Sequence, residues 1–287
     1  MPVLRVFFGA FVLLLAPRPV AAAPHLFAQL DPPRAGQRIL VIAPHIDDEG
    51  LAAAGYVSDA LALGAEVFIV HLTAGDHSRS ALAANRLTFF AAAPLNRKGQ
   101  RRIREGQAAA RAIGLNEEHV VLLGYPDRGL RRMVLRPDRA VRSSSTGMRS
   151  VPYDQALSPG APYRLESILS DLRAVFHEIQ PDIVIAPADQ DHHPDHRAAA
   201  ALLTRVLGEL DLAPLRLGYV IHARGVRWSR TAAAADGTWA EYRLAPGTQE
   251  KKRQMLAGYR SQRRSPYMHL LFARSRAPRE LFMKYPG

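Results

Sequence analysis

Short apolar runs of strand length recur along this chain, with stretches of helical periodicity between them. The runs are RILVIA from Arg38, EVFIVHLTA from Glu66, VVLLGY from Val120, DIVIAPA from Asp182 and LGYVIHA from Leu217. Continuous apolar runs of this length, rich in valine and isoleucine, are typical of strands buried on both faces. We therefore expect a mostly parallel sheet.

Helices are predicted between these strands, in LAAAGYVSDALALG after the first and in RRIREGQAAARAIG before the third. The clearest is LESILSDLRAVFHEI, whose apolar residues share one face: Leu165, Ile168, Leu169, Leu172, Val175, Phe176 and Ile179. Alternating strands and helices favour an α/β protein with helices on both sides of the sheet. The predicted fold is a Rossmann-like three-layer sandwich in a single domain.

The polar stretch from 131 to 162 breaks this alternation. It contains RPDRAVRSSSTG and SPGAPY, which are rich in turn-forming residues. A loop this long in a compact domain is usually functional or disordered. Two interpretations stay open: its arginines Arg136, Arg139 and Arg142 flank a cleft for an extended or anionic chain, or it is a mobile surface loop. Neither a repeat nor a linker divides 24–287, so one domain is expected there.

Residues 1–23 have the pattern of a secretory signal peptide. Arg5 precedes VFFGAFVLLLA, an apolar run of 11 residues that is followed by PRP and the small residues VAAA. This run is too short to span a bilayer as a helix. We expect cleavage near Ala22 or Ala23, a periplasmic or secreted protein, and no stable membrane span in the mature chain. The alternative is a buried N-terminal helix or an uncleaved anchor.

The amino-acid composition restricts the possible reactive groups and binding partners. The 287 residues include no cysteine, which excludes disulfides, a lipidated cysteine and thiolates as nucleophiles or metal ligands. The formal net charge of +12 favours an anionic glycan, a phosphate-bearing substrate or a membrane surface, although coding bias would give the same charge. Nucleic acid is not an expected partner, because export removes it and basic residues do not interleave with aromatic ones.

Two predicted strands end in clusters of polar residues. PHIDDEG (44–50) follows the first strand, and PADQDHHPDHRAAA (187–200) follows the fourth and leads into a helix near Pro194. Ligands in such sheets bind beyond the carboxyl ends of the strands. Helix capping alone would explain the three carboxylates of the first cluster. It would not explain His45 or the second cluster.

The spacing of these residues suits a metal site. His45 and Asp48 stand three residues apart, as do His193 and His196, so each pair lies on one side of a turn. Two imidazoles and one carboxylate with an open fourth position are typical of catalytic zinc. Such a metal polarises a carbonyl and lowers the pKa of water to about 7. A nearby carboxylate can take the water's proton, and a second imidazole can stabilise the oxyanion and protonate the leaving amine.

PHIDDE and DHHPDH resemble two motifs of the PIG-L/LmbE-like family of zinc-dependent N-acetylglucosaminyl deacetylases, Pro-His-x-Asp-Asp-Glu and Asp-x-His-x-Asp-His. Other stretches resemble the family in the same order: HLTAGD from His71, RRIREGQAAARAIGL from Arg101, LGYPDRGL from Leu123 and KRQMLAGYRSQ from Lys252. The likeness spans most of 38–282, with 131–162 unmatched. Ile46 departs from the family, many of whose members have proline there.

This resemblance implies roles for individual residues. The implied ligands of Zn²⁺, or of another divalent metal, are His45, Asp48 and His196. The implied catalytic residues are Asp47 as general base, His193 as general acid and oxyanion partner, and Asp195, which would orient His193. The implied sugar contacts are Arg102 and Asp127, with Arg101 and Arg104 close enough to compete with Arg102. Among the remaining histidines, we expect His71 to be packed in the core and His177 to be solvated.

The predicted function is an exported zinc amidohydrolase that removes N-acetyl groups from N-acetylglucosamine-type sugars. Export favours a cell-envelope glycan or exopolysaccharide as its substrate. One alternative, a non-catalytic glycan-binding protein, is disfavoured because Asp47 and His193 are both present. A metal-dependent hydrolase of another amide stays open as a second alternative, whereas a metal-dependent phosphoesterase would need more carboxylates to bind paired metals. The absence of GxxxxGK and GxSxG further disfavours phosphate-loop and serine chemistry. The oligomeric state is left open.

Overall fold

The computed structural model describes residues 27–77, 93–223, 238–264 and 266–285. The expected signal peptide lies outside these ranges. Within them, no helix combines the length and the apolar character that crossing a bilayer would require.

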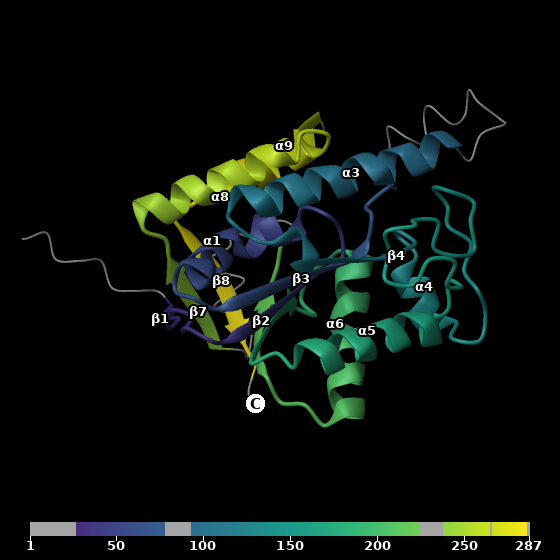
Figure 1. Cartoon of the computed structure of the whole chain (residues 1–287), viewed down its shortest axis with the longest axis horizontal. Helices are drawn as coiled ribbons and strands as arrows, with labels where there is room; N and C mark the ends of the chain where they lie inside the picture. Colours follow the sequence, from purple (N-terminus) through teal and green to yellow (C-terminus); the bar gives the residue numbers. More distant parts are fainter. Residues whose placement is uncertain (1–26, 78–92, 224–237, 265, 286–287) are drawn as a thin grey trace, which may run out of the picture.

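A mostly parallel sheet forms the centre of the molecule, as predicted (Figure 1). In the described part of the chain its strands run in the order β1-β7-β8-β6-β5-β2-β3-β4. Their bounds are β1 Ala28–Gln29, β2 Arg38–Ala43, β3 Glu66–Thr73, β4 Val120–Tyr125, β5 Ile183–Pro187, β6 Leu215–Tyr219, β7 Thr238–Arg243 and β8 Arg279–Lys284. Only β8, among these, runs antiparallel to its neighbours β6 and β7.

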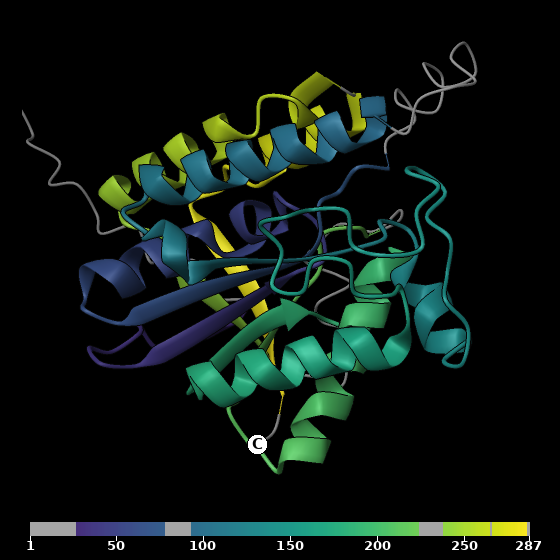
Figure 2. The ribbon, with the colours of Figure 1, turned by 45° about the vertical axis from the view of Figure 1, so that its right-hand side comes forward.

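Helices cover both faces of the sheet (Figures 1 and 2). One face carries α1 (Asp48–Ala62), α3 (Ala93–Ala112), α8 (Pro246–Gly258) and α9 (Pro266–Arg274). The other carries α4 (Leu130–Leu135), α5 (Leu165–Ile179) and α6 (Pro194–Leu210). The α/β three-layer prediction is confirmed. The core lies between these layers, with every residue of β5 buried.

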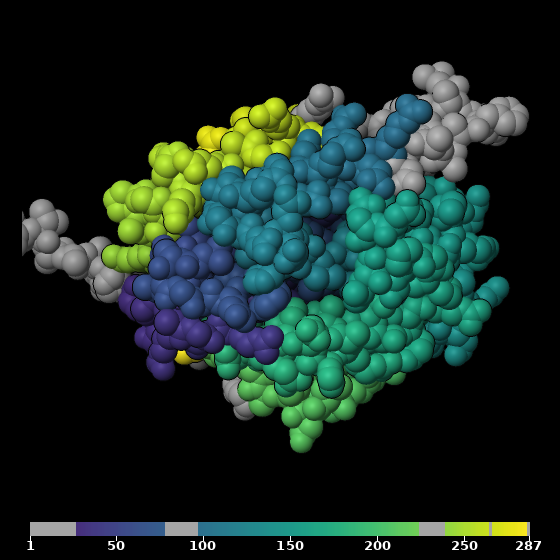
Figure 3. Space-filling view, in the orientation of Figure 1, coloured from purple at the N-terminus to yellow at the C-terminus, as the bar shows by residue number. Residues whose placement is uncertain are grey.

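Several boundaries differ from the prediction. The structure reproduces the predicted bounds of β2, β4 and α5, but β6 ends at Tyr219, so the residues from 220 to 223 are not strand. The expected long loop begins as helix α4. The remainder of that loop buries Val151, Tyr153 and Ala156, and its surface is continuous with that of α5 (Figure 3). These contacts hold part of the segment against the core.

A buried ion pair ties β8 to two helices. Lys252 on α8 and Glu280 on β8 are only 2% and 3% exposed, and Lys252 Nζ lies 2.6 Å from Glu280 Oε1. The same carboxylate accepts hydrogen bonds from the amides of Gly55 and Tyr56 in α1, each at 2.8 Å. Both oxygens of Glu280 are therefore satisfied inside the protein.

Replacing Lys252 with methionine is expected to lower the free energy of unfolding by about 3–5 kcal/mol, because it leaves the Glu280 charge buried and uncompensated. Arg253→Met is the control, since Arg253 forms an exposed pair with Glu250. Such exposed pairs are worth about 1 kcal/mol or less. Urea denaturation measures both variants, and equal losses of stability would contradict the assignment.

Candidate metal and catalytic site

Polar side chains gather beyond the carboxyl ends of neighbouring parallel strands. His45 follows β2, Asp127 follows β4, the segment 191–196 follows β5, and His222 follows β6. Parallel strands end at the same edge of a sheet, so the sheet order places these segments together. The sequence clusters at 44–50 and 187–200 therefore share one site.

Asp48 is the residue on which the predicted metal ligands converge. It is the first residue of α1 and only 2% exposed. Its Oδ2 accepts the His45 amide at 2.9 Å and lies 3.1 Å from both His45 Nδ1 and His196 Nε2. The structure thus brings His45, Asp48 and His196 together around one carboxylate oxygen.

Two imidazole nitrogens at this site are buried without a hydrogen-bond partner among the described residues, namely His45 Nε2 and His196 Nε2. His196 Nε2 lies 3.1 Å from Asp48, yet it is not aligned for a hydrogen bond. Unpaired buried polar atoms are costly. A divalent cation bound by nitrogen and oxygen ligands would satisfy them, and zinc accepts this donor set. The residues present therefore fit a metal ion.

Three overlapping groups of side chains in the described ranges bring potential ligand atoms within 4.8 Å of one another. They are His45 with His193 and His196, Asp48 with His196 and His222, and His45 with Asp127 and Asp195. His45 and His196 share the first group, and Asp48 and His196 share the second. His222, which follows the last of the predicted strands, is an addition to the predicted ligand set.

The surrounding carboxylates stabilise positive charge here. Burial lowers the pKa of His196, but Asp48 and Asp191 outweigh it and raise that pKa to about 9. Burial also opposes protonation of His45, and Asp48 with other carboxylates raises its pKa well above the usual value. The same negative potential would favour a metal ion.

Asp191 holds the predicted metal ligand His196 in position, although the sequence predicted no role for it. It is fully buried, and its Oδ2 lies 3.0 Å from His196 Nδ1. That oxygen also accepts the amides of Ile221 and His222, at 2.9 and 3.1 Å. Asp191 therefore turns His196 so that Nε2 faces Asp48. Its place at the start of DHHPDH was the available sequence signal.

We expect Asp191→Asn to weaken zinc binding by about 10–100-fold, because the hydrogen-bond partner of a metal-binding histidine fixes its orientation and basicity. Asp189→Asn is a matched control: Asp189 is exposed and accepts a hydrogen bond from Tyr285 instead. Competition against a coloured zinc chelator would compare the two variants. Equal zinc affinities would show that Asp191 does not act through His196.

Asp47 has the surroundings of a general base. It is 2% exposed, with Oδ1 lying 3.1 Å from Arg102 Nη2 and Oδ2 having no partner in the described part of the chain. Burial raises its pKa to about 7, against the opposing effect of Arg102. A base with a pKa near the working pH is effective in proton transfer.

Of the two predicted sugar-contacting residues, Arg102 lies against Asp47 and Asp127 lies against His45. Arg102 is buried and donates hydrogen bonds to the carbonyls of Gly75 and Ile46, whereas Arg101 and Arg104 are exposed. Arg102 therefore positions Asp47. Asp127 is also buried, with Oδ1 3.4 Å from His45 Nε2 and Oδ2 accepting the His77 amide at 2.7 Å.

His193 is held through the backbone. It is the N-cap of α6, and its Nδ1 accepts the Asp195 amide at 3.3 Å. A neutral His193 therefore carries its proton on Nε2. Burial, reinforced by His45 and His196, lowers its pKa to about 2.

The Asp195 carboxylate lies elsewhere than predicted. Its Oδ2 accepts the Arg128 amide at 2.5 Å and lies 3.5 Å from His45 Nε2. Asp195 thus contacts His193 by its main chain, while its side chain faces His45.

Comparison with known proteins identifies the family of the chain. Residues 40–207 match the model of the PIG-L family, described as GlcNAc-PI de-N-acetylase. The chain belongs to the PIG-L family. A search of curated proteins gave no match.

Solved structures share the PIG-L fold. The zinc-inhibited form of teicoplanin deacetylase is 18% identical, with a TM-score of 0.56 over 86% of this chain and 97% of that one. N,N'-diacetylchitobiose deacetylase from Pyrococcus horikoshii is 17% identical, with a TM-score of 0.51 over 87% and 83%. The 4-carboxy-2-hydroxymuconate hydratase from Pseudomonas putida is 15% identical, with a TM-score of 0.55 over 88% and 97%. At these identities the likeness establishes the fold.

Glu49 links Asp47, the predicted general base, to two other elements. Asp47 has a φ of 139°, outside the usual range for a residue with a side chain. Glu49 Oε2 accepts the Asp47 amide at 3.1 Å, and its Oε1 lies 2.7 Å from the Tyr259 hydroxyl and 3.0 Å from His71 Nε2. His71 is buried as expected and also holds this carboxylate. A strained backbone conformation such as that of Asp47 persists where several surrounding contacts hold it in place.

The long segment of the PIG-L chain is anchored beside the site. Asp76, after β3, accepts hydrogen bonds from the hydroxyls of Ser145 and Tyr153, both at 2.9 Å. Ser144 Oγ lies 3.1 Å from Nδ1 of His77, whose amide binds Asp127. Part of the segment 131–162 thus lies next to the predicted metal ligands.

Proposed function

We propose that this PIG-L protein is a metal-dependent N-deacetylase acting on N-acetylglucosamine-type sugars. The observation that carries the proposal is Asp47, a buried carboxylate with one free oxygen, in the same site as a convergent set of metal donors. The family match, described as GlcNAc-PI de-N-acetylase, supports the amide and the sugar. The fold alone does not choose the reaction, since a hydratase shares it.

His45, Asp48 and His196 would hold the metal, with Asp191 orienting His196. Zinc, when bound, supplies Lewis-acid polarisation of the amide carbonyl and a lower pKa for water. Asp47 accepts the proton of the attacking water at Oδ2, while Arg102 holds Oδ1. His193 offers Nε2–H, because Nδ1 is occupied by the Asp195 amide. We assign that group to stabilising the oxyanion, and Asp47 then passes the proton that it took from water to the leaving nitrogen, which releases the free amine and acetate.

We also propose that the enzyme acts outside the cytoplasm, on a cell-envelope glycan or exopolysaccharide. The signal-peptide pattern of residues 1–23 supports export. The net positive charge of the chain would favour an anionic polymer near the cleft.

Removing the metal is expected to abolish acetate release from N-acetylglucosamine oligomers, and zinc should restore it, because the proposed reaction needs the Lewis acid. Acetate would be measured on the purified mature protein as isolated, after chelation and after zinc is returned. Release that persists after complete chelation would overturn the metal dependence. Absence of release from every oligomer with zinc bound would overturn the substrate assignment.

A further inference from the structure

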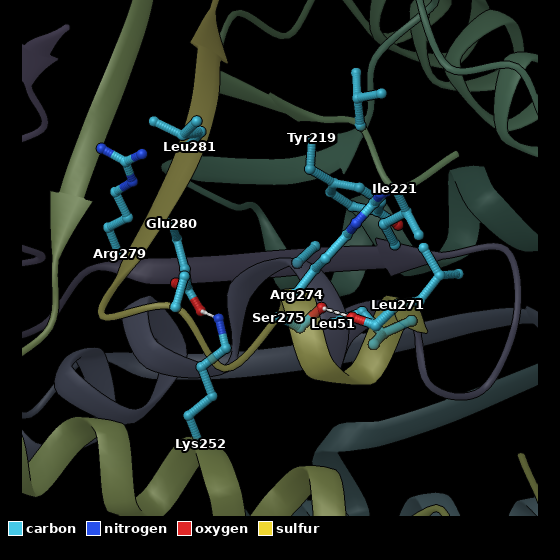
Figure 4. Close-up of a pocket in the computed structure, with 13 residues that line it drawn as sticks. Leu51, Tyr219, Ile221, Lys252, Leu271, Arg274, Ser275, Arg279, Glu280 and Leu281 are labelled. Atoms are coloured by element: carbon cyan, nitrogen blue, oxygen red, sulfur yellow. Dashed lines mark hydrogen bonds and ion pairs between the residues drawn. The ribbon is translucent and has the colours of Figure 1, made fainter. Parts of the chain in front are cut away.

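A cavity lies on the side of the sheet covered by α1, α8 and α9. Its volume is about 450 Å³ (Figure 4). Small-molecule sites typically have volumes of about 300–1,000 Å³. Neither the metal ligands nor Asp47 line this cavity.

The walls of the cavity are largely apolar. Aliphatic and aromatic side chains come from the start of α1, the end of β6, helix α9 and β8: Leu51, Ala52, Tyr219, Val220, Ile221, Leu271 and Leu281. Burying apolar surface against such walls is favourable for a hydrocarbon group, at roughly 25 cal/mol per Å². A polyol such as a sugar would lose its hydrogen bonds to water there. The walls therefore favour an alkyl chain over a sugar.

Three cationic side chains also line the cavity, and two are already paired. Lys252 binds Glu280, and Arg279 Nη1 lies 3.0 Å from Glu241. Arg274 is exposed at the rim of the cavity and has no acidic partner in the described part of the chain. Figure 4 shows its side chain extending from α9 toward Tyr219 and Ile221. The cavity thus combines apolar walls with one uncompensated guanidinium.

Tyr219 separates this cavity from the metal site. Its ring centroid lies 6.2 Å from that of His196, and its hydroxyl donates to the Ile42 carbonyl at 3.0 Å. The Tyr219 side chain is buried, and this hydrogen bond fixes its hydroxyl end. A ligand in the cavity can therefore bind without entering the catalytic site.

We propose that this cavity binds a small amphipathic anion, with an alkyl chain against the apolar walls and a carboxylate or phosphate head on Arg274. Arginine suits both heads, because its planar guanidinium can donate two parallel hydrogen bonds. This binding is additional to deacetylation. The lining and the charge of the cavity are independent of the proposed reaction.

Calorimetric titration of the mature protein tests the proposal with matched ligands. Decanoate and decyl phosphate should bind, decyltrimethylammonium should bind at least tenfold more weakly, and decanol should fall between them. Concentrations stay below the micellar range. The two anionic ligands distinguish a carboxylate head from a phosphate head.

Two variants and one control locate the site. Arg274→Gln should weaken decanoate binding by about tenfold or more, since it removes a charge-assisted contact. Ala277→Phe should block binding by filling the cavity that Ala277 lines. Arg276→Gln, an exposed arginine two residues from Arg274 and outside the lining, should bind as the unmodified protein does. No decanoate binding, or binding that neither Arg274→Gln nor Ala277→Phe reduces, would overturn the proposal.

Discussion

Replacing Asp47 with asparagine is expected to slow acetate release by about 10²–10⁴-fold, the contribution of a positioned general base. Asparagine has nearly the same shape and keeps an oxygen for Arg102, which lies 3.1 Å from Oδ1 in the structure. It cannot accept the proton of the attacking water. Asp47 is not among the proposed ligands, so zinc content should stay close to that of the unmodified protein.

The measurement pairs acetate release with metal analysis of the same samples. Asp189→Asn serves again as the control, because it removes an exposed carboxylate that follows β5 at the same edge of the sheet. A normal rate in Asp47→Asn would exclude Asp47 as the base. Loss of zinc from Asp47→Asn would instead place Asp47 among the ligands.

Strands with strong apolar runs were predictable, and strands that rely on tertiary contacts were not. The residues of β2 are almost all buried, so RILVIA carries a clear pattern. RELFMK of β8 has charged residues at both ends, and Glu280 is buried where Lys252 and the amides of α1 satisfy its carboxylate. A short stretch of sequence does not reveal that pairing. Strand β8 was therefore missed.

The sequence predicted which residues gather at the site, but it did not predict how they contact one another. His45, Asp48 and His196 stand out because charged groups rarely follow buried strands in such density. His222 stands alone after β6, and only the sheet order puts it beside His196, with ring centroids 4.7 Å apart. Spacing also cannot say which atom of a residue makes a contact. For that reason the Asp195 carboxylate was expected at His193, whereas the backbone amide makes that hydrogen bond.

Replacing His193 and His196 one at a time is expected to separate the loss of catalysis from the loss of metal binding. His193→Ala should slow acetate release by about 10²–10³-fold, the usual effect of losing one oxyanion donor. Its zinc affinity should change little, because the proposed ligands remain. His196→Ala should lose zinc affinity as well as activity, since His196 is fully buried between Asp48 and Asp191.

Zinc affinity by chelator competition is the readout that distinguishes the two histidine variants, because activity falls in both. His192→Ala is the matched control, as His192 is exposed and precedes His193 in the same loop. Equal loss of zinc from His193→Ala and His196→Ala would place His193 among the ligands, consistent with its grouping with His45 and His196. The oxyanion donor would then have to be another group at this edge, and His222, whose ring centroid lies 4.9 Å from that of His193, would be the next to replace.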